Sequence, residues 1–192
     1  MEITVKKLEE AGYNSALVGL SLNKNKQPQD MDDVAFTLSD KDYGHNKFLE
    51  HMYVWLLVRA PRYWWSEADT YRMSTKQSQS TIHTVMKNLL KFEDFEDGDI
   101  YHEDLVSLNN LINEKEFLIL KKKLPEGFMQ TREWCLSYKT LSNIFTQRAT
   151  HKLPHWHEFI RQVLDQVQYP EFLNKKLKDS KWKQIYPKSL EN

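Results

Sequence analysis

Arginines recur close to aromatic residues along this chain, and that combination of side chains can bind a nucleotide. Arg62 precedes Tyr63 and Trp64, and Arg72 follows Tyr71. A guanidinium matches the geometry of a phosphate and also stacks on flat rings. A nucleotide or a flavin presents a phosphate and a ring system together. The alternative is a set of surface ion pairs with carboxylates. The arginines concerned are Arg59, Arg62, Arg72, Arg132, Arg148 and Arg161.

A second group that could do chemistry is the run of histidines between residues 151 and 158. His151, His155 and His157 lie within seven residues, with Glu158 beside them, and the spacing of four between His151 and His155 could ligate zinc on one helix face, as in a zinc hydrolase. Pro154 lies between them, and if a helix starts there, His151 falls outside it. Hydrogen bonding at helix ends is therefore the alternative, and we assign no metal ligand.

Two further stretches carry reactive or polar side chains. The sequence STKQSQST, residues 74–81, could bind phosphate oxygens or a base edge, but its composition is also typical of a solvated loop, which we expect here. The single cysteine, Cys135, excludes an internal disulfide and a Cys-rich metal site. Its apolar and aromatic neighbours, in EWCLSY, indicate a buried, unreactive thiol rather than a nucleophile.

The elements that must position these residues are predicted to be a mixture of strands and helices. Apolar alternation and β-branched or aromatic content predict strands near residues 2–7, 52–60 and 128–137. Helices are expected over 62–72 and 103–123, and in KTLSNIFTQR and PHWHEFIRQVLDQV. Because the order is mixed rather than a regular strand–helix alternation, we expect an α+β fold with a central, mostly antiparallel sheet.

Length and charge narrow the class of protein. The 192 residues suggest one domain, residues 1–175, followed by a charged tail, residues 176–192. Lys and Arg together number 27, as do Asp and Glu, so no overall field favours nucleic acid or a membrane as partner. The chain has no apolar run of membrane-spanning length and no secretion signal at its start, so we expect a cytoplasmic protein. No Gly-rich phosphate-binding fingerprint appears.

Taken together, several short motifs resemble those of the flavin-dependent thymidylate synthases, especially a divergent branch of small phage and prophage proteins. A family segment His-x₄-Glu-His before a strand ending in Ala-Pro is matched by residues 45–61. The family signature Arg-His-Arg, seven residues, Ser falls on residues 70–80. The positions that fit are His45, Glu50, His51, Ala60, Pro61, Arg72 and Ser80, and the signature's first two positions fall on Thr70 and Tyr71.

The resemblance continues to about residue 165 and includes clear departures. Tyr-Thr-Arg of the family is matched by residues 130–132, and its helix with Asn and Arg by Asn143 and Arg148. A His-Ala-Gln-Trp-Glu run is matched loosely by residues 151–158. The first Arg and the His of the signature are replaced by Thr70 and Tyr71. The Arg-Tyr that follows the family's Ser is replaced by Ile82 and His83.

The resemblance implies a homotetramer of α+β subunits in which reduced FAD relays a one-carbon unit from methylenetetrahydrofolate to C5 of dUMP, with NADPH as reductant. It implies catalytic roles for Arg72 and Ser80, and contacts to the nucleotide from Arg132 and Arg148. The flavin would be contacted by His45, Glu50, His51, Tyr71 and Asn143. Because the signature is altered, another pyrimidine nucleotide could be the substrate. The alternative function is a catalytically silent nucleotide- or protein-binding module on the same fold.

Overall fold

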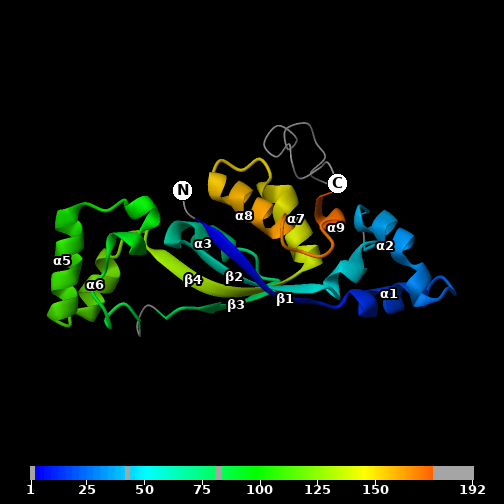
Figure 1. The fold of residues 1–192 in the computed structure, drawn as a ribbon, viewed down its shortest axis with the longest axis horizontal. Helices are drawn as coiled ribbons and strands as arrows, with labels where there is room; N and C mark the ends of the chain where they lie inside the picture. Colours follow the sequence, from blue (N-terminus) through cyan, green and yellow to red (C-terminus); the bar gives the residue numbers. More distant parts are fainter. Residues whose placement is uncertain (1–2, 42–43, 81–83, 175–192) are drawn as a thin grey trace.

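A four-stranded antiparallel sheet forms the centre of the molecule (Figure 1). The computed structural model describes residues 3–41, 44–80 and 84–174, so the predicted tail, residues 176–192, lies outside the described residues. The strands, in the order β1-β2-β4-β3, are β1 (Thr4–Ala11), β2 (Tyr53–Pro61), β4 (Met129–Ser137) and β3 (Ser74–Ser78). The predicted α+β class with an antiparallel sheet is confirmed.

Helices cover one face of this sheet and extend beyond both of its ends (Figure 1). Those over the sheet are α3 (Arg62–Ala68), α7 (Tyr138–Arg148) and α8 (Pro154–Leu164), with α9 (Glu171–Asn174) beside them. One end carries α1 (Tyr13–Ser21), α2 (Asp32–Ser39) and the short 3₁₀ helices η1 (Pro28–Asp30) and η2 (Lys47–Glu50). The other carries η3 (Phe92–Asp94), η4 (Glu96–Gly98), α5 (His102–Asn113) and α6 (Phe117–Lys123).

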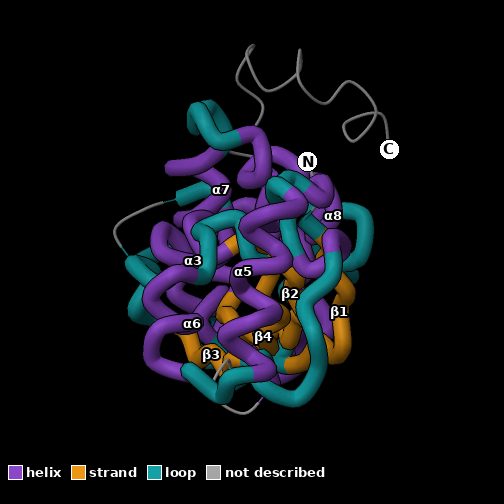
Figure 2. The backbone as a smooth tube through the Cα atoms, turned by 90° about the vertical axis from the view of Figure 1, so that its left-hand side faces the viewer, coloured by secondary structure: helices purple, strands orange, loops and turns teal. Residues whose placement is uncertain are grey.

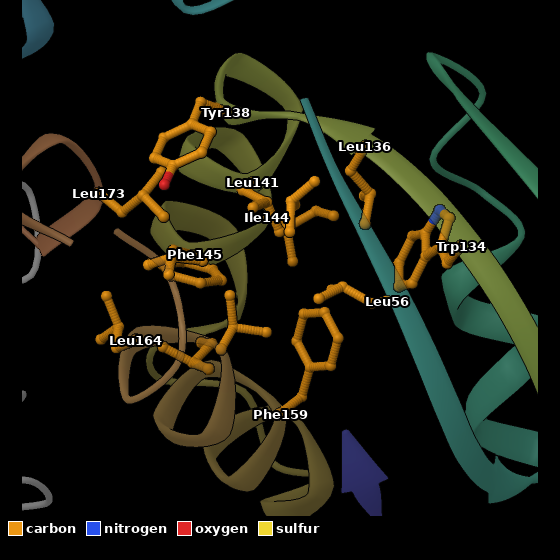
Figure 3. Close-up of a cluster of buried hydrophobic side chains, with 14 of the residues drawn as sticks. Leu56, Trp134, Leu136, Tyr138, Leu141, Ile144, Phe145, Phe159, Leu164 and Leu173 are labelled. Carbon is orange, nitrogen blue, oxygen red and sulfur yellow. The ribbon is translucent and has the colours of Figure 1, made fainter. Parts of the chain in front are cut away.

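The alternating pattern of β2 explains why only one face of the sheet is covered. Val54, Leu56 and Val58 are fully buried under the helices, whereas Tyr53 and Leu57 point to the opposite face and are 42% and 37% exposed. Successive side chains of a strand point to opposite faces, so the apolar set of β2 packs on one side. Figure 3 shows this core between β2, β4, α7 and α8, with Leu56, Leu136, Phe145 and Phe159 turned toward one another.

Four tryptophans occupy the part of the core below α3. Trp64 and Trp65 of α3 meet Trp134 of β4 and Trp156 of α8, and all four are fully buried. The ring centroids of Trp64 and Trp156 are 4.5 Å apart, and those of Trp64 and Trp65 are 5.0 Å apart. Aromatic pairs at these separations add to the stability that burial alone provides. The aromatic stretch around residue 64 is therefore, first of all, core.

A second, smaller core lies at one end of the sheet, in what we call the α5–α6 lobe (residues 84–128). In Figure 2 α5 and α6 stand in front of the sheet, at one end of the long axis of Figure 1. Its buried apolar residues form a cluster of their own, separate from the main core. They are Val85, Leu90, Phe95, Leu105, Leu108, Ile112, Leu120, Leu124 and Phe128.

Several sequence expectations about elements were wrong in detail. Residues 74–78 form the edge strand β3 rather than a loop, because backbone pairing with β4 holds a polar segment that buries little apolar surface. The helix expected over 103–123 is divided into α5 and α6, since Lys115 takes a left-handed conformation with φ 60°. The helix expected over 62–72 ends at Ala68.

Length and apolar character decide whether a helix can cross a membrane. No helix within residues 3–41, 44–80 and 84–174 has both the length and the apolar character needed to cross a bilayer.

Candidate functional site

Arg148, at the last turn of α7, is the centre of a polar cluster above the tryptophans. The helix starts where β4 ends, because the side chain of Ser137 accepts a hydrogen bond from the backbone N–H of Thr140. Eleven residues of helix then bring the Arg148 guanidinium over the ring of Trp156, 4.7 Å from its centroid. Its Nε donates to the Tyr71 hydroxyl over 2.8 Å.

Glu67 of α3 fixes this arginine from below. Its Oε2 accepts a hydrogen bond from Arg148 Nη1 and another from Trp156 Nε1, each over 2.8 Å. A carboxylate that accepts two such bonds holds both donors in one orientation, and charge-assisted bonds are the stronger kind. The cluster therefore presents a guanidinium and the Tyr71 hydroxyl in a fixed arrangement.

Arg132, on β4, forms a parallel arrangement at the other side of α3. Its guanidinium lies 4.5 Å from the centroid of Trp65, and its Nη1 is 3.0 Å from both carboxylate oxygens of Asp69, which caps the end of α3. Lys76 of β3 lies 3.8 Å from the same carboxylate. Burial lowers the pKa of the Lys76 ammonium, an effect that the Asp69 charge partly opposes.

A basic pocket of about 280 Å³ opens beside Arg132. Cations reach it from three elements: Arg62 from α3, Lys121 from α6 and Arg132 from β4. Glu126 neutralises part of this charge through an ion pair of 3.2 Å with Arg62. The Nε of Arg132 is buried and has no hydrogen-bond partner in the described structure. The arrangement favours an anion with several acceptor oxygens. The pocket is lined by Arg62, Ser66, Lys121, Leu124, Glu126, Gln130 and Arg132.

The expected nucleotide contacts Arg132 and Arg148 are thus brought to the two sides of one short helix, with Tyr71 beside Arg148. Ser80 follows β3 close to Arg132, since Gln79 donates its backbone N–H to the carbonyl of Thr131. Arg72 is exposed to solvent next to Tyr71. The replaced positions 82 and 83 lie outside the described residues.

The expected flavin contacts at 45–51 line a different pocket, which we call the α1–η2 pocket. His45, Glu50 and His51 form its rim, and the pocket has a volume of about 550 Å³. Leu20, Val34, Leu38 and Phe48 provide an apolar floor, while Lys24 and Lys47 add positive charge. Size and lining are typical of a site for a partly apolar ligand.

Asn143 connects this pocket with the Arg148 cluster along the exposed side of α7. It lies one turn after Lys139, whose ammonium donates to Asn46 Oδ1 over 2.5 Å, next to His45. One turn further, Gln147 accepts a hydrogen bond from the Tyr71 hydroxyl over 3.0 Å. Asn143 therefore stands between the two groups of predicted site residues.

The histidine group serves two separate hydrogen-bond networks. His151 Nε2 is 2.8 Å from Arg148 Nη1, whereas His155 is buried and bonds to Glu96. Among the residues that the structure describes, no three His, Cys, Asp or Glu side chains are grouped to hold a metal ion.

Comparisons with known proteins identify the fold. No protein-family model and no curated protein sequence matches the chain. Thymidylate Synthase X (ThyX) from Helicobacter pylori, solved with FAD and dUMP, superposes with a TM-score of 0.77 at 16% identity, over 92% of this chain and 100% of that one. A second structure of that enzyme with FAD and dUMP gives 0.72 at 14% identity, over 90% and 98%. The fold is that of the flavin-dependent thymidylate synthases.

The same fold carries a related activity in another of the similar structures. A UMP/dUMP methylase, PolB from Streptomyces cacaoi, solved with 5-Br UMP, superposes with a TM-score of 0.61 at 13% identity, over 90% of this chain and 93% of that one. Proteins with the flavin-dependent thymidylate synthase fold thus include enzymes named for two pyrimidine nucleotides.

Sequence reasoning missed three charged residues that this chain places around the site, Glu67, Asp69 and Lys121, and it did not single out Arg62 among the arginines. Glu67 and Asp69 hold the two arginines, but isolated carboxylates after an aromatic run look like ordinary surface residues. Lys121 belongs to the run KKK, which reads as a helix end, and Arg62 was grouped with every other arginine. The spacing of Glu67 and Asp69 after Trp64 and Trp65 is the one signal that could have indicated them.

Proposed function

We propose that this protein binds a pyrimidine nucleoside monophosphate and transfers a one-carbon unit to its base with the help of FAD, as a thymidylate synthase-like enzyme acting on dUMP or a related pyrimidine. The observation that carries the proposal is the basic pocket, in which Arg132 has an unpaired buried Nε beside Lys121 and Arg62. A nucleotide phosphate offers the acceptor oxygens that such a site lacks.

The two arginines then have different tasks. Arg132, with Lys121, would bind the phosphate. Arg148 would face the base, because its guanidinium is held rigidly by Glu67 and Trp156 and can stabilise negative charge that develops on a pyrimidine carbonyl. Arg72, just before β3, and Ser80, just after it, would complete the contacts to the substrate.

The α1–η2 pocket and the face of α7 fit the flavin. The apolar lining suits a flat ring system, Lys47 supplies a positive group for a diphosphate, and the ring nitrogens of His45 and His51 can hydrogen-bond to it. Glu50, Tyr71 and Asn143 would provide hydrogen bonds. When bound, reduced flavin would supply the one-carbon relay and the reducing power. NADPH and methylenetetrahydrofolate would be the co-substrates.

The proposal includes assembly into a homotetramer in the cytosol of a bacterium or a phage-infected cell, as the resemblance implies. The expected flavin contacts His45, Glu50 and His51 and the expected nucleotide contact Arg132 line separate pockets of one chain, which supports a site completed by another subunit. Light scattering of the purified protein tests this: a molar mass near that of the 23.0 kDa monomer contradicts it.

The function is tested by cofactor uptake and by growth. The purified protein should take up FAD and show the absorbance bands of bound flavin, and titration calorimetry should show binding of dUMP or UMP. Complementation of thymidine-requiring cells should restore growth if dUMP is the substrate. A protein that binds neither FAD nor any pyrimidine monophosphate would contradict the proposal.

A catalytically silent nucleotide- or protein-binding module on the same fold is the second candidate function. It is favoured by one observation, the replacement of the signature's first Arg and His by Thr70 and Tyr71, with the Tyr71 hydroxyl already bonded to Arg148 and Gln147. Nucleotide binding without FAD uptake would support this candidate.

A further inference from the structure

The α5–α6 lobe and the main core share no apolar cluster, so other contacts must fix how they sit against each other. The apolar residues of the lobe pack among themselves. Among the described residues, backbone bonds join the two parts where Arg62 and Tyr63 donate their N–H groups to the carbonyls of Phe128 and Glu126, and where Thr84 donates to Ser80 as the chain enters the lobe. Arg59 of β2 also reaches the lobe, since its Nη2 donates to the carbonyl of Glu93 over 2.5 Å. Arg62 Nη1 also donates to the carbonyl of Leu124 over 2.6 Å. These bonds connect the lobe to β2 and α3.

Glu96, in η4 of the lobe, makes the contact that reaches α8. Its Oε1 bonds to Nε2 of His155, and its Oε2 accepts a hydrogen bond of 2.5 Å from the Tyr63 hydroxyl. A carboxylate only accepts hydrogen bonds, so Nε2 carries the hydrogen. Both oxygens of Glu96 are therefore occupied, one from α8 and one from α3.

These three residues are largely removed from water. His155 is 5% exposed, and the Glu96 side chain is 17% exposed. Burial, followed by the hydrogen bond to Glu96, raises the pKa of the Tyr63 hydroxyl. The Tyr63 hydroxyl and His155 Nε2 also lie 3.1 Å apart, so each of the three side chains contacts the other two. Removing Glu96 takes away the carboxylate to which both of the others bond and leaves them partly buried without it.

The basic pocket lies across the same boundary. Arg62, Ser66, Gln130 and Arg132 belong to the core, whereas Lys121, Leu124 and Glu126 belong to the lobe. The position of Lys121 relative to Arg132 therefore depends on how the lobe is held. We infer that Tyr63, Glu96 and His155 form a latch that fixes the α5–α6 lobe on the core and thereby sets the spacing of the cations in the basic pocket.

His155 is accordingly a positioning residue, and so is Glu96, which does not line the basic pocket. Hydrogen exchange tests the latch from both of its sides, and the readout does not depend on the proposed function. In Glu96→Ala and in His155→Leu, amide exchange over residues 92–98 and 117–123 should become about tenfold faster, while exchange in β4 stays within twofold. Glu93→Ala, in the neighbouring 3₁₀ helix η3, removes an exposed side chain but keeps the backbone carbonyl that accepts from Arg59, and it should leave exchange unchanged.

A conservative variant and an anion probe complete the experiment. His155→Gln keeps an N–H at the position of Nε2 and should restore slow exchange. Calorimetry with inorganic pyrophosphate should show an affinity about tenfold weaker in Glu96→Ala than in the unmodified protein.

The outcomes separate the parts of the inference. Unchanged exchange in both Glu96→Ala and His155→Leu overturns the latch, and Glu96→Ala alone decides it if His155→Leu does not fold. Faster exchange with unchanged pyrophosphate affinity overturns the link to the pocket, which rests on the proposed function. If the unmodified protein binds no pyrophosphate, the link to the pocket and the proposed anion site fail, whereas faster exchange in the variants still supports the latch.

Discussion

The Arg148 guanidinium lies over the ring of Trp156, and both donate a hydrogen bond to the same carboxylate oxygen of Glu67. The contact with the Trp156 ring, the bond to Glu67 and the bond from Nε to the Tyr71 hydroxyl together restrain the arginine. A cation that is fixed before a ligand arrives loses little entropy on binding. The same arrangement occurs at Arg132, which stacks on Trp65 and bonds to Asp69.

Replacing Arg132 tests its assignment to the substrate. Arg132→Ala should weaken binding of a pyrimidine monophosphate by about 1.5–3 kcal/mol, the scale of hydrogen bonds to charged groups. Titration calorimetry measures this. Arg161→Ala serves as control, because that side chain is 43% exposed and pairs with carboxylates of its own helix. Unchanged affinity in Arg132→Ala would show that the assignment is wrong.

Replacing Glu67 tests the support of Arg148. Glu67→Ala removes the acceptor of two hydrogen bonds and should lower the free energy of unfolding by about 1–3 kcal/mol. Glu67→Gln keeps an acceptor oxygen and should lose less. Urea denaturation followed by tryptophan fluorescence measures both. If the alanine variant unfolds within about 0.5 kcal/mol of the unmodified protein, Glu67 contributes no net stability.

Gly12 tests the turn that places His51 at the α1–η2 pocket. A Cβ at this position would lie 1.9 Å from the carbonyl oxygen of His51, and the φ of 103° is unfavourable for any other residue. Gly12→Ala should therefore cost at least about 2 kcal/mol of stability. Gly19→Ala, in the middle of α1 with no atom within 4 Å of the added carbon, should be neutral or stabilising by up to about 1 kcal/mol. Equal thermal unfolding of the two variants would refute this account of Gly12.

Cys135 should be dispensable. Burial, together with the nearby charge of Glu133, raises the pKa of its thiol, so little thiolate exists near neutral pH. We expect Cys135→Ser to retain nucleotide and FAD affinity within about twofold. We also expect the native thiol to react more slowly with a disulfide reagent than a free thiol does. Loss of flavin uptake in the serine variant would contradict both the pKa argument and the proposed chemistry.

Tyr138 should make the protein less stable at high pH. Burial, with a hydrogen bond to Glu10, raises the pKa of this hydroxyl in the folded state. The unfolded chain releases the proton near pH 10, so above that pH the unfolded state binds fewer protons and is favoured. The free energy of unfolding should then fall by about 1.4 kcal/mol per pH unit from this residue. Denaturation between neutral pH and alkaline pH measures the slope.

Matched variants isolate the contribution of this tyrosine. Tyr138→Phe should flatten the decline. Tyr101→Phe, where the ring is 79% exposed, should not. The same slope in both variants would assign the effect to other groups.

The sequence predicted the parts of the fold that depend on burial. The stretch near 52–60 is rich in aromatic and β-branched residues, and both it and the stretch near 128–137 were found as strands, β2 and β4. The edge strand β3 was missed because STKQS shows no apolar period. What holds it is backbone pairing with β4 and a bond from Trp134 Nε1 to Ser74. Neither contact can be inferred from residues 74–78 alone.

The sequence pointed to Arg132 and Arg148 as candidate site residues, but it did not point to the residues that hold them in place. In the sequence both arginines lie near aromatic residues, and this proximity indicates nucleotide binding. Glu67 is 81 positions from Arg148, and Lys121 lies on a different element from Arg132, so only the folded chain brings each pair together. The roles of all the predicted site residues remain predictions: His45, Glu50, His51, Tyr71, Arg72, Ser80, Arg132, Asn143 and Arg148.

The last residue of β4, Ser137, is also the cap that starts α7, with no linker between strand and helix. A slip of β4 by one position in the sheet would turn the whole of α7 about its axis and carry Asn143 and Arg148 away from their partners. Insertions or deletions between residues 129 and 148 should therefore be rare among descendants of this chain, and length variation should accumulate instead in the connections at either end of the molecule.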